Sequence, residues 1–489
     1  MPYRSYVKLV MLPALLAMLL CACKKDVMPD VKHPERSASQ QLKDSIYRYY
    51  TQYSLWSDAS TADQSAVEAF TDTYDAPQDL LNALKSMTPN YPAYNGPIDR
   101  FSYLESSGSD GLMANAAQAA TPGFGLYLSI AAVSNDKAYP IVYFVEGGSA
   151  AEKAGIRRSD AIIALDGQDF GIPINCNSGA CNVIDPALQQ QVVNSLLSAL
   201  ERNTLRVTLR HSDDAESTMT ITAQPYDVNP INSKRIFSYP GQHIGYLALS
   251  SFEDLTAGQP NRFRLDAVFS EFENNQINDL ILDLRYNTGG YISAAEYVAN
   301  RVIPAAADGK LMYKYALNAY MSQRKNWKGE SFDDVYYKRN GNLNLKTVYF
   351  LVTDITASAA ELLINVLRPY MRVVIIAEND GTYGKPVGFF KQEIMGKTAL
   401  WAASFKLINS RGETDYWDGI QADQRKVVDY IFRDFGDPEE TMIAAAITHA
   451  TGTGTLQPRK TMGTLRQLKQ VRKTRITQVN AIPQSNMFR

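Results

Sequence analysis

Histidine is scarce in this chain of 489 residues, which contains four: His33, His211, His243 and His449. None lies in the segments 283–291, 353–362 or 378–388, where the other candidate site residues cluster. Only His243 stands beside an expected core strand, so the sequence gives little support to a serine–histidine hydrolase. That alternative stays open because the members of a catalytic triad meet in space and not in sequence.

An excess of charge of either sign is also missing, since 49 Lys and Arg residues balance 51 Asp and Glu residues. This balance offers no electrostatic basis for binding nucleic acid or an acidic polymer. The overall composition is that of a folded globular protein. The length exceeds what one ordinary core can bury, so we expect about two to four domains.

Long apolar runs are absent except at the start of the chain. There, Arg4 and Lys8 precede an apolar stretch from Leu9 to Leu20. Such a stretch is too short and wrongly flanked for a spanning helix and predicts a secretory signal.

The signal ends in Leu20-Cys21-Ala22-Cys23, which resembles a bacterial lipobox. We therefore predict that residues 1–22 are removed and that Cys23 carries lipid, which would anchor the chain to a membrane without spanning it. The implied location is the cell envelope, on the periplasmic face or the outer-membrane surface. Ordinary signal cleavage near Cys23 without lipid is the alternative.

Cysteine is equally scarce in the rest of the chain, where only Cys176 and Cys181 remain, in the loop-like stretch NCNSGACN. In an exported protein a local disulfide between them is plausible. Two cysteines with no nearby histidine cannot fill four positions around zinc, so no metal site is expected here.

Residues 123–167 carry features of a peptide-binding module. They are a Gly-Phe-Gly turn before a strand, a strand at 141–145, a short helix at 150–154 and the strand-turn SDAIIALDG. This pattern resembles a PDZ domain over residues 120–226. The resemblance implies that an extended peptide adds as a strand beside Leu126, with its carboxylate held by backbone N–H groups. The implied peptide-binding residues are Gly123, Phe124, Gly125 and Leu126.

From residue 232 the sequence pattern changes. Apolar runs typical of buried strands alternate with segments whose apolar residues have helical spacing. The strand-like stretches are QHIGYLALSSF, NDLILDLRYNTGG, KTVYFLVTDIT and RVVIIAE, and FRLDAVFSEF has helical spacing. This alternation predicts an α/β core with parallel strands and crossover helices. Residues that follow the strands should therefore meet at one edge of the sheet.

Ser358 follows one of these strands, in TDITASAAELLINVL. With Glu361 three residues later it forms a capping-box pattern, so a purely structural role is the simple interpretation. Lys385 lies in the turn GTYGKPVG after the next strand, which should bring it near Ser358. A buried lysine loses its proton readily and can then accept one from a serine.

Gly289 and Gly290 end the strand segment DLRYNTGG. Glycines after a buried strand allow a sharp turn that exposes N–H groups. The N–H of Ala359 is free of an intrahelical acceptor because it begins a helix. These donors and a serine nucleophile could together form an acyl-transfer site.

In this order, behind a PDZ-like segment, the motifs resemble the C-terminal processing peptidases, also called tail-specific proteases. The matching motifs are Asp283–Gly290, Thr356–Glu361 and Glu378–Lys385, and DYWDGIQAD looks like a late structural segment of the family. The resemblance implies that Ser358 is the nucleophile and Lys385 the general base, with Ala359 and a glycine of the Gly289-Gly290 pair as oxyanion donors. No metal or organic cofactor is implied.

The chain departs from the family pattern around the lysine. Pro-Val-Gly-Phe follows Lys385, so a glutamine thought to orient the lysine is missing from its usual place, and Pro369 replaces an acidic residue of some members. Thr382 and Gln392 are the candidates for supporting Lys385. A peptide-binding lipoprotein without catalysis is therefore the alternative function.

The predicted fold is a multidomain α+β chain. The predicted parts are a signal peptide at 1–22, a tether at 23–40, a helical N-terminal domain at 41–105, a PDZ-like domain at 120–226, a Ser–Lys peptidase core at 232–455 and a basic tail at 456–489. The expected activity is that of a lipid-anchored serine endopeptidase acting on disordered or C-terminal segments of polypeptides. The sequence does not indicate an oligomeric state.

Overall fold

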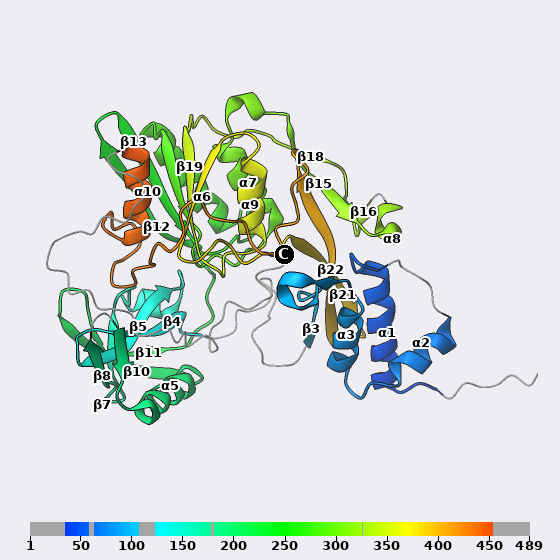
Figure 1. Ribbon diagram of the computed structural model, residues 1–489, viewed down its shortest axis with the longest axis horizontal. Helices are drawn as coiled ribbons and strands as arrows, with labels where there is room; N and C mark the ends of the chain where they lie inside the picture. The colour runs from blue at the N-terminus through cyan, green and yellow to red at the C-terminus, as the bar shows by residue number, and fades with distance from the viewer. Residues whose placement is uncertain (1–34, 58–62, 107–122, 178–179, 325, 453–489) are drawn as a thin grey trace, which may run out of the picture.

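The computed structural model describes residues 35–57, 63–106, 123–177, 180–324 and 326–452. The predicted signal peptide, Cys23, His33 and the basic tail lie outside these residues. Within them, no helix combines the length and the apolar character needed to cross a membrane. Figure 1 shows N-terminal helices in blue, a β-rich unit in cyan and dark green, and an α/β core from green to orange.

The core is built on a five-stranded sheet in the order β12-β13-β14-β19-β20. Four of its strands are parallel, and β12 pairs antiparallel at one edge. The strands are β12 (Ile231–Tyr239), β13 (Gln242–Leu249), β14 (Asp279–Asp283), β19 (Thr347–Val352) and β20 (Arg372–Ala377). The apolar run of β14 is buried throughout, as expected for a strand that is covered on both faces.

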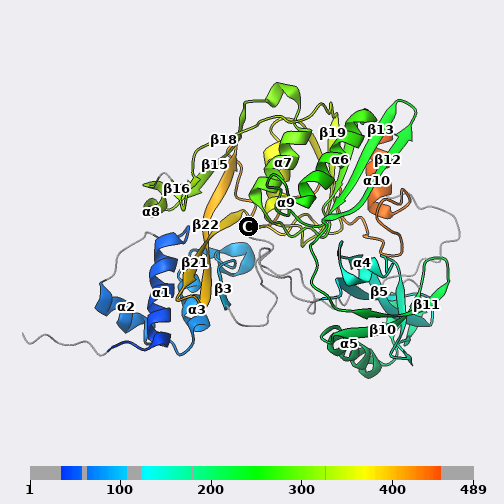
Figure 2. The ribbon, with the colours of Figure 1, turned by 180° about the vertical axis from the view of Figure 1, so that it is seen from behind.

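Helices cover both faces of this sheet. On one face, Leu280 and Leu282 share a core with residues of α6 (Pro260–Asn274), α7 (Ile292–Val302) and α9 (Ala359–Leu367). On the other face, Ile281 packs with α10 (Thr441–Thr451). Figure 1 shows α10 in front of the sheet. Figure 2, which views the molecule from the opposite side, shows α6 and α7 in front of it. The predicted α/β core is confirmed.

A second, antiparallel sheet was not expected from the sequence. Its order is β18-β15-β22-β21, and β3 pairs with β22. The strands are β3 (Tyr103–Ser106), β15 (Leu311–Leu317), β18 (Val335–Tyr336), β21 (Val387–Ile394) and β22 (Thr398–Asn409). Because β21 begins two residues after Lys385, this sheet forms a wall beside the candidate site.

The N-terminal region differs from the predicted helical domain. It contains α1 (Ala38–Tyr53), α2 (Gln64–Thr71) and α3 (Pro77–Ser86), followed by β1 (Asn90–Tyr91), η1 (Pro92–Tyr94), β2 (Gly96–Pro97) and β3. The prediction of helix up to residue 105 was wrong because Pro89, Pro92 and Pro97 prevent a helix from continuing. The predicted tether was slightly too long, since the capping box of Ser37 and Gln40 starts α1 at Ala38.

These N-terminal helices do not form a separate core. Ile46 and Tyr50 of α1 pack against Ile394, Leu400 and Ala402 of the second sheet. The N-terminal region is therefore an extension of the α/β core, although residues 107–230 separate it in sequence from the first strand of that core.

The β-rich unit has strands and a helix at the residues that the PDZ resemblance implies. Its elements are β4 (Leu126–Ala132), β5 (Lys137–Val145), α4 (Ala150–Lys153), β6 (Ala161–Leu165), β7 (Gln168–Asp169), β8 (Ile172–Asn177), β9 (Ala180–Val183), α5 (Pro186–Leu200), β10 (Thr204–Arg210) and β11 (Glu216–Thr222). Cys176 and Cys181 face each other across β8 and β9 and are joined by a disulfide. That this unit is a PDZ domain stays a prediction.

Arg158 links this unit to the core through buried contacts. Its guanidinium pairs with Asp429 and donates to the hydroxyl of Tyr286 at 2.7 Å. Asp429 also pairs with Arg285 at 2.8 Å, just before the Gly289-Gly290 turn. The remaining short elements are η2 (Ala305–Ala307), α8 (Ala319–Ser322), β16 (Asn326–Trp327) and β17 (Glu330–Ser331).

Candidate active site

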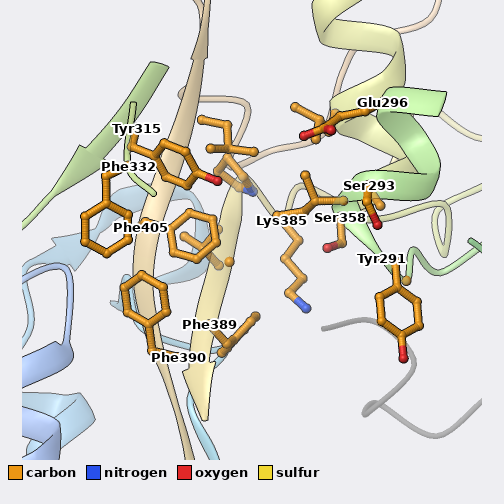
Figure 3. Close-up of a pocket in the computed structure, with 18 of the residues that line it drawn as sticks. Tyr291, Ser293, Glu296, Tyr315, Phe332, Ser358, Lys385, Phe389, Phe390 and Phe405 are labelled. Carbon is orange, nitrogen blue, oxygen red and sulfur yellow. The ribbon is translucent and has the colours of Figure 1, made fainter. Parts of the chain in front are cut away.

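The candidate site lies at the carboxyl ends of three parallel strands. Gly290 follows β14, Ser358 follows β19, and Lys385 follows β20. With Ala359, these residues line a single pocket of about 390 Å³. Figure 3 shows Ser358 and Lys385 at this pocket. The convergence of strand ends therefore brings together the residues that the sequence singled out.

Ser358 precedes α9 in a strained backbone conformation, with φ of 56° and ψ of −116°. Its N–H donates to Oε2 of Glu361 at 2.9 Å, which is one half of the predicted capping box. Non-glycine residues keep a positive φ only where the surroundings impose it, and such positions concentrate at functional sites. The helix start thus fixes the backbone of Ser358 rigidly beside the pocket.

Lys385 is almost completely buried, with 1% of its surface exposed. Burial holds the pKa of its amine well below the ordinary value, and the nearby Glu361 carboxyl opposes that effect only in part. The Nζ atom lies 4.5 Å from the centre of the Phe389 ring. This environment favours the neutral amine that a general base requires.

Gly290 and Ala359 supply the two N–H groups that can stabilise an oxyanion. Phe252 pairs with the residues flanking Gly290, donating to the Gly289 carbonyl at 2.9 Å and accepting from Tyr291 at 2.8 Å. In such a parallel pairing, the N–H of the middle residue points away from the partner. Within the described part of the chain, neither the N–H of Gly290 nor that of Ala359 has an acceptor.

Gly289 does not act as an N–H donor to the pocket, so this part of the prediction is corrected. Its N–H donates instead to Oδ1 of Asn287 at 2.9 Å. A Cβ atom at Gly289 would lie 2.8 Å from the Cβ of Ser358, closer than real Cβ atoms approach. Gly289 is needed because its lack of a side chain lets the turn approach the serine.

Glu361 connects the backbone of Ser358 to that of Lys385, a role that the sequence did not reveal. Its carboxylate is fully buried and accepts four hydrogen bonds. The donors are the N–H groups of Ser358, Gly384 and Lys385 and the hydroxyl of Thr382. Burial raises the pKa of the Glu361 carboxyl, whereas these hydrogen bonds act to lower it.

Thr382 and Gln392 do not support Lys385 in the way the sequence suggested. The hydroxyl of Thr382 donates to Glu361 at 2.5 Å and accepts the N–H of Ile420 at 2.7 Å. Gln392 lies near the far end of β21 and does not line the pocket. Strand β21 therefore carries Gln392 away from the site. Thr382 contacts Glu361, so it can act on Lys385 through that carboxylate.

The histidine alternative receives no support from the geometry. His243 lies at the amino end of β13, level with the start of β19. Ser358 lies beyond the opposite end of β19, so strand length alone separates them by about 20 Å. His211 is bonded to Asp160 and Ser217, and His449 to Tyr349.

The pocket beyond Ser358 has an aromatic wall. Four rings contact one another in a chain along it: Tyr315, Phe332, Phe390 and Phe405. Figure 3 shows these rings on the side of the pocket opposite Glu296. Burial raises the pKa of the Glu296 carboxyl, which accepts a hydrogen bond from Tyr313. Such a pocket suits a large apolar side chain.

The predicted peptide-binding residues lie away from this pocket, in the β-rich unit. Phe124 and Gly125 are buried, and their carbonyls accept the N–H groups of Ala151 at 3.0 Å and Glu146 at 2.9 Å. A Cβ at Gly125 would lie 2.3 Å from that of Ser149, so only glycine fits this turn.

Comparison with known proteins shows which family this part of the chain is similar to. Residues 243–425 match the model of peptidase family S41. A carboxyl-terminal-processing protease of Synechocystis is 27% identical over 240 residues, covering 49% of this chain and 47% of that protein. A chloroplastic C-terminal processing peptidase of Tetradesmus obliquus is 27% identical over 326 residues, covering 64% of this chain and 59% of the relative. The chain thus spans about half the length of the curated relatives it matches.

A solved structure from Bacteroides fragilis, described as an S41 protease, superposes with a TM-score of 0.62. The two sequences are 22% identical, and the match covers 87% of this chain and 100% of the other. At that identity the likeness establishes the fold. The chain therefore contains a peptidase family S41 domain and is a relative of the carboxyl-terminal-processing proteases.

Proposed function

We propose that the protein is a serine endopeptidase in which Ser358 and Lys385 form a catalytic dyad. The observation that carries this proposal is their position in one pocket, with two N–H groups that have no acceptor in the described chain. Neutral Lys385 takes the proton of Ser358 as its Oγ attacks the peptide carbonyl. The N–H groups of Gly290 and Ala359 stabilise the resulting oxyanion.

The later steps use the same groups. The lysine returns its proton to the leaving amine, which leaves an acyl group on Ser358. It then takes a proton from water as the water attacks that acyl group. When the bond to Oγ breaks, the lysine gives this proton to Oγ of Ser358, and the carboxylic product departs with both residues restored. No metal or organic cofactor enters this sequence.

We propose that the substrates are disordered or C-terminal segments of polypeptides. Within the described residues, β4 pairs with β5 alone, so its second edge can take an added peptide strand. The turn at Gly123 to Leu126 would receive the end of that peptide as part of a PDZ domain. The aromatic wall of the pocket favours a large apolar residue before the cleaved bond.

We further propose that the protein is exported and held at the cell envelope by lipid on Cys23. The support is the basic, apolar and cysteine-containing pattern of residues 1–23. Metabolic labelling with an alkyne fatty acid tests this proposal directly. Labelling should disappear in Cys23→Ala, and persistent labelling of that variant would contradict it.

Cleavage of an unfolded polypeptide by the purified mature protein tests the dyad. Wild type and His243→Ala should cut it, while Ser358→Ala and Lys385→Ala should not. Unchanged cleavage by Ser358→Ala would overturn the mechanism. A wild type that binds peptides without cutting them would favour a binding lipoprotein, and loss of activity in a folded His243→Ala alone would assign the base to histidine.

A further inference from the structure

The N-terminal region reaches the turn that carries Lys385. Arg100 precedes β3 and lies outside the S41 match, yet its Nη2 atom donates to backbone carbonyls of the turn at 382–385. The distances are 3.0 Å to the oxygen of Gly384 and 3.3 Å to that of Tyr383. The same nitrogen lies 3.2 Å from the carbonyl oxygen of Trp417, which flanks the turn.

Glu361 holds the same two peptide groups from the other side. It accepts the N–H of Gly384 at 2.7 Å and the N–H of Lys385 at 2.8 Å. Each of the two peptide groups before Lys385 therefore has its carbonyl on a guanidinium and its N–H on a carboxylate. Hydrogen bonds to charged groups are roughly twice as strong as neutral ones.

The turn depends on such external contacts because its glycine cannot fix the backbone conformation by itself. Gly384 has a φ of +92°, and a Cβ there would lie 2.1 Å from the carbonyl oxygen of Trp417. A glycine has no side chain with which to fix its own backbone, and it is the residue with the most conformational freedom. The contacts from Arg100 and Glu361 compensate for that freedom.

Arg100 is itself held in place. Its guanidinium lies 3.9 Å from the ring centre of Tyr94 and 4.6 Å from that of Tyr383. The neighbouring Asp99 is fully buried and accepts the hydroxyl of Tyr50 at 2.6 Å. The arginine is therefore presented by a rigid segment that is anchored on α1.

We propose that Arg100 is a positioning residue for Lys385, so that residues 90–106 complete the active site from outside the S41 domain. This inference rests on the proposed Ser358–Lys385 function. Without the guanidinium, the carbonyls of Tyr383 and Gly384 lose their charged donor and the turn relaxes. The amine then shifts relative to Ser358 and becomes more accessible to water.

Peptide cleavage by the full mature protein tests the inference in Arg100→Ala and Arg100→Lys. The control is Arg48→Ala, whose guanidinium donates to the side chain of Gln64 on α2. We expect kcat of Arg100→Ala to fall about tenfold to a hundredfold with KM nearly unchanged, since small misplacements of a catalytic group are costly. Arg100→Lys should recover only part of the lost kcat, because an ammonium lacks the planar set of N–H donors of a guanidinium. Unchanged kcat in Arg100→Ala would overturn the inference.

Titration of Lys385 by NMR in protein labelled with 13C-lysine tests the inference even if the wild type proves inactive. The Lys385 signal is identified by its absence in Lys385→Ala. Its pKa should move toward the ordinary value of about 10.4 in both Arg100→Ala and Arg100→Lys, and stay in place in Arg48→Ala. Two titratable groups near the amine, the Glu361 carboxyl and the pocket residue Tyr416, are the same in every variant, so they cannot cause a difference between variants. A shift in Arg100→Ala alone would indicate a charge effect without positioning, and no shift would contradict the inference.

Discussion

The carboxylate of Glu361 accepts the backbone N–H of Lys385 at 2.8 Å across 24 positions of sequence. The same Oε2 atom accepts the N–H of Ser358 at 2.9 Å. One oxygen thus joins the backbone of Ser358 to the backbone of Lys385. The residues of the proposed dyad are therefore placed by a shared buried acceptor, and a change at Glu361 should affect both of them.

Glu361→Gln should impair both stability and catalysis. The substitution puts an NH2 group where one carboxylate oxygen accepts two hydrogen bonds, so donors then face donors. We expect the free energy of unfolding to fall by about 1–3 kcal/mol, the cost of unsatisfied buried groups. Urea unfolding and peptide cleavage measure the two effects. Glu393→Gln, on a side chain that is 71% exposed, should change neither.

Lys385→Met should raise stability at neutral pH while abolishing cleavage. Burial lowers the pKa of Lys385 in the folded state, so the unfolded chain binds more protons between that lowered pKa and about 10.4. Stability from this group therefore rises with pH across that window. Thermal unfolding in a pH series should show the advantage of Lys385→Met shrinking as the pH approaches about 10.4.

The control for this series is Ser358→Ala, which retains the lysine. Its thermal midpoint should follow the pH dependence of the wild type. A gap between Lys385→Met and the wild type that stays constant with pH would mean that Lys385 does not titrate abnormally.

Phe332→Ala should change which peptides are cut. The ring is part of the aromatic wall and contacts Tyr315 and Phe390. We expect kcat/KM to fall about tenfold for peptides with Phe or Leu before the cleaved bond, and less for peptides with Ala there. Phe263→Ala, at a surface position that is 63% exposed, serves as the control. Equal losses for both peptides would assign Phe332 to general stability.

Arg158→Ala should weaken the attachment of the β-rich unit to the core. Both Arg158 and Asp429 are buried, and breaking a buried pair costs about 3–5 kcal/mol. Urea unfolding should show the loss, together with faster proteolysis between the two parts. Arg210→Ala removes the exposed pair with Glu216 and should cost at most about 1 kcal/mol. Similar costs for both variants would contradict the structural role of the link.

Local pattern predicts the α/β core well because its strands are continuous apolar runs. The same reasoning failed at β3, whose partner strand β22 lies about three hundred residues away and cannot be seen in a local window. The pairing of Tyr103 with Trp401 overrides the helical spacing of the preceding region. The prolines at 89–97 were the one local feature from which the end of the helical region could have been predicted.

The site also contains residues that the sequence predicts and residues that it does not. Ser358 and Lys385 could be predicted because each follows a strand of one parallel sheet. The choice between Gly289 and Gly290 could not, since it depends on where the side chain of Asn287 and the backbone of Phe252 lie. The role of Arg100 depends on a contact across 284 positions of sequence, for which no local pattern exists.

Reaction of the intact protein with a fluorophosphonate tests the central claim most directly, because it reports the nucleophile and its base together. Peptide mass spectrometry should locate the label on Ser358. The rate of labelling should rise with pH through one ionisation below about pH 10.4, and that ionisation should be absent in Lys385→Met. Labelling of another residue, or the same pH profile in Lys385→Met, would contradict a Ser358–Lys385 dyad.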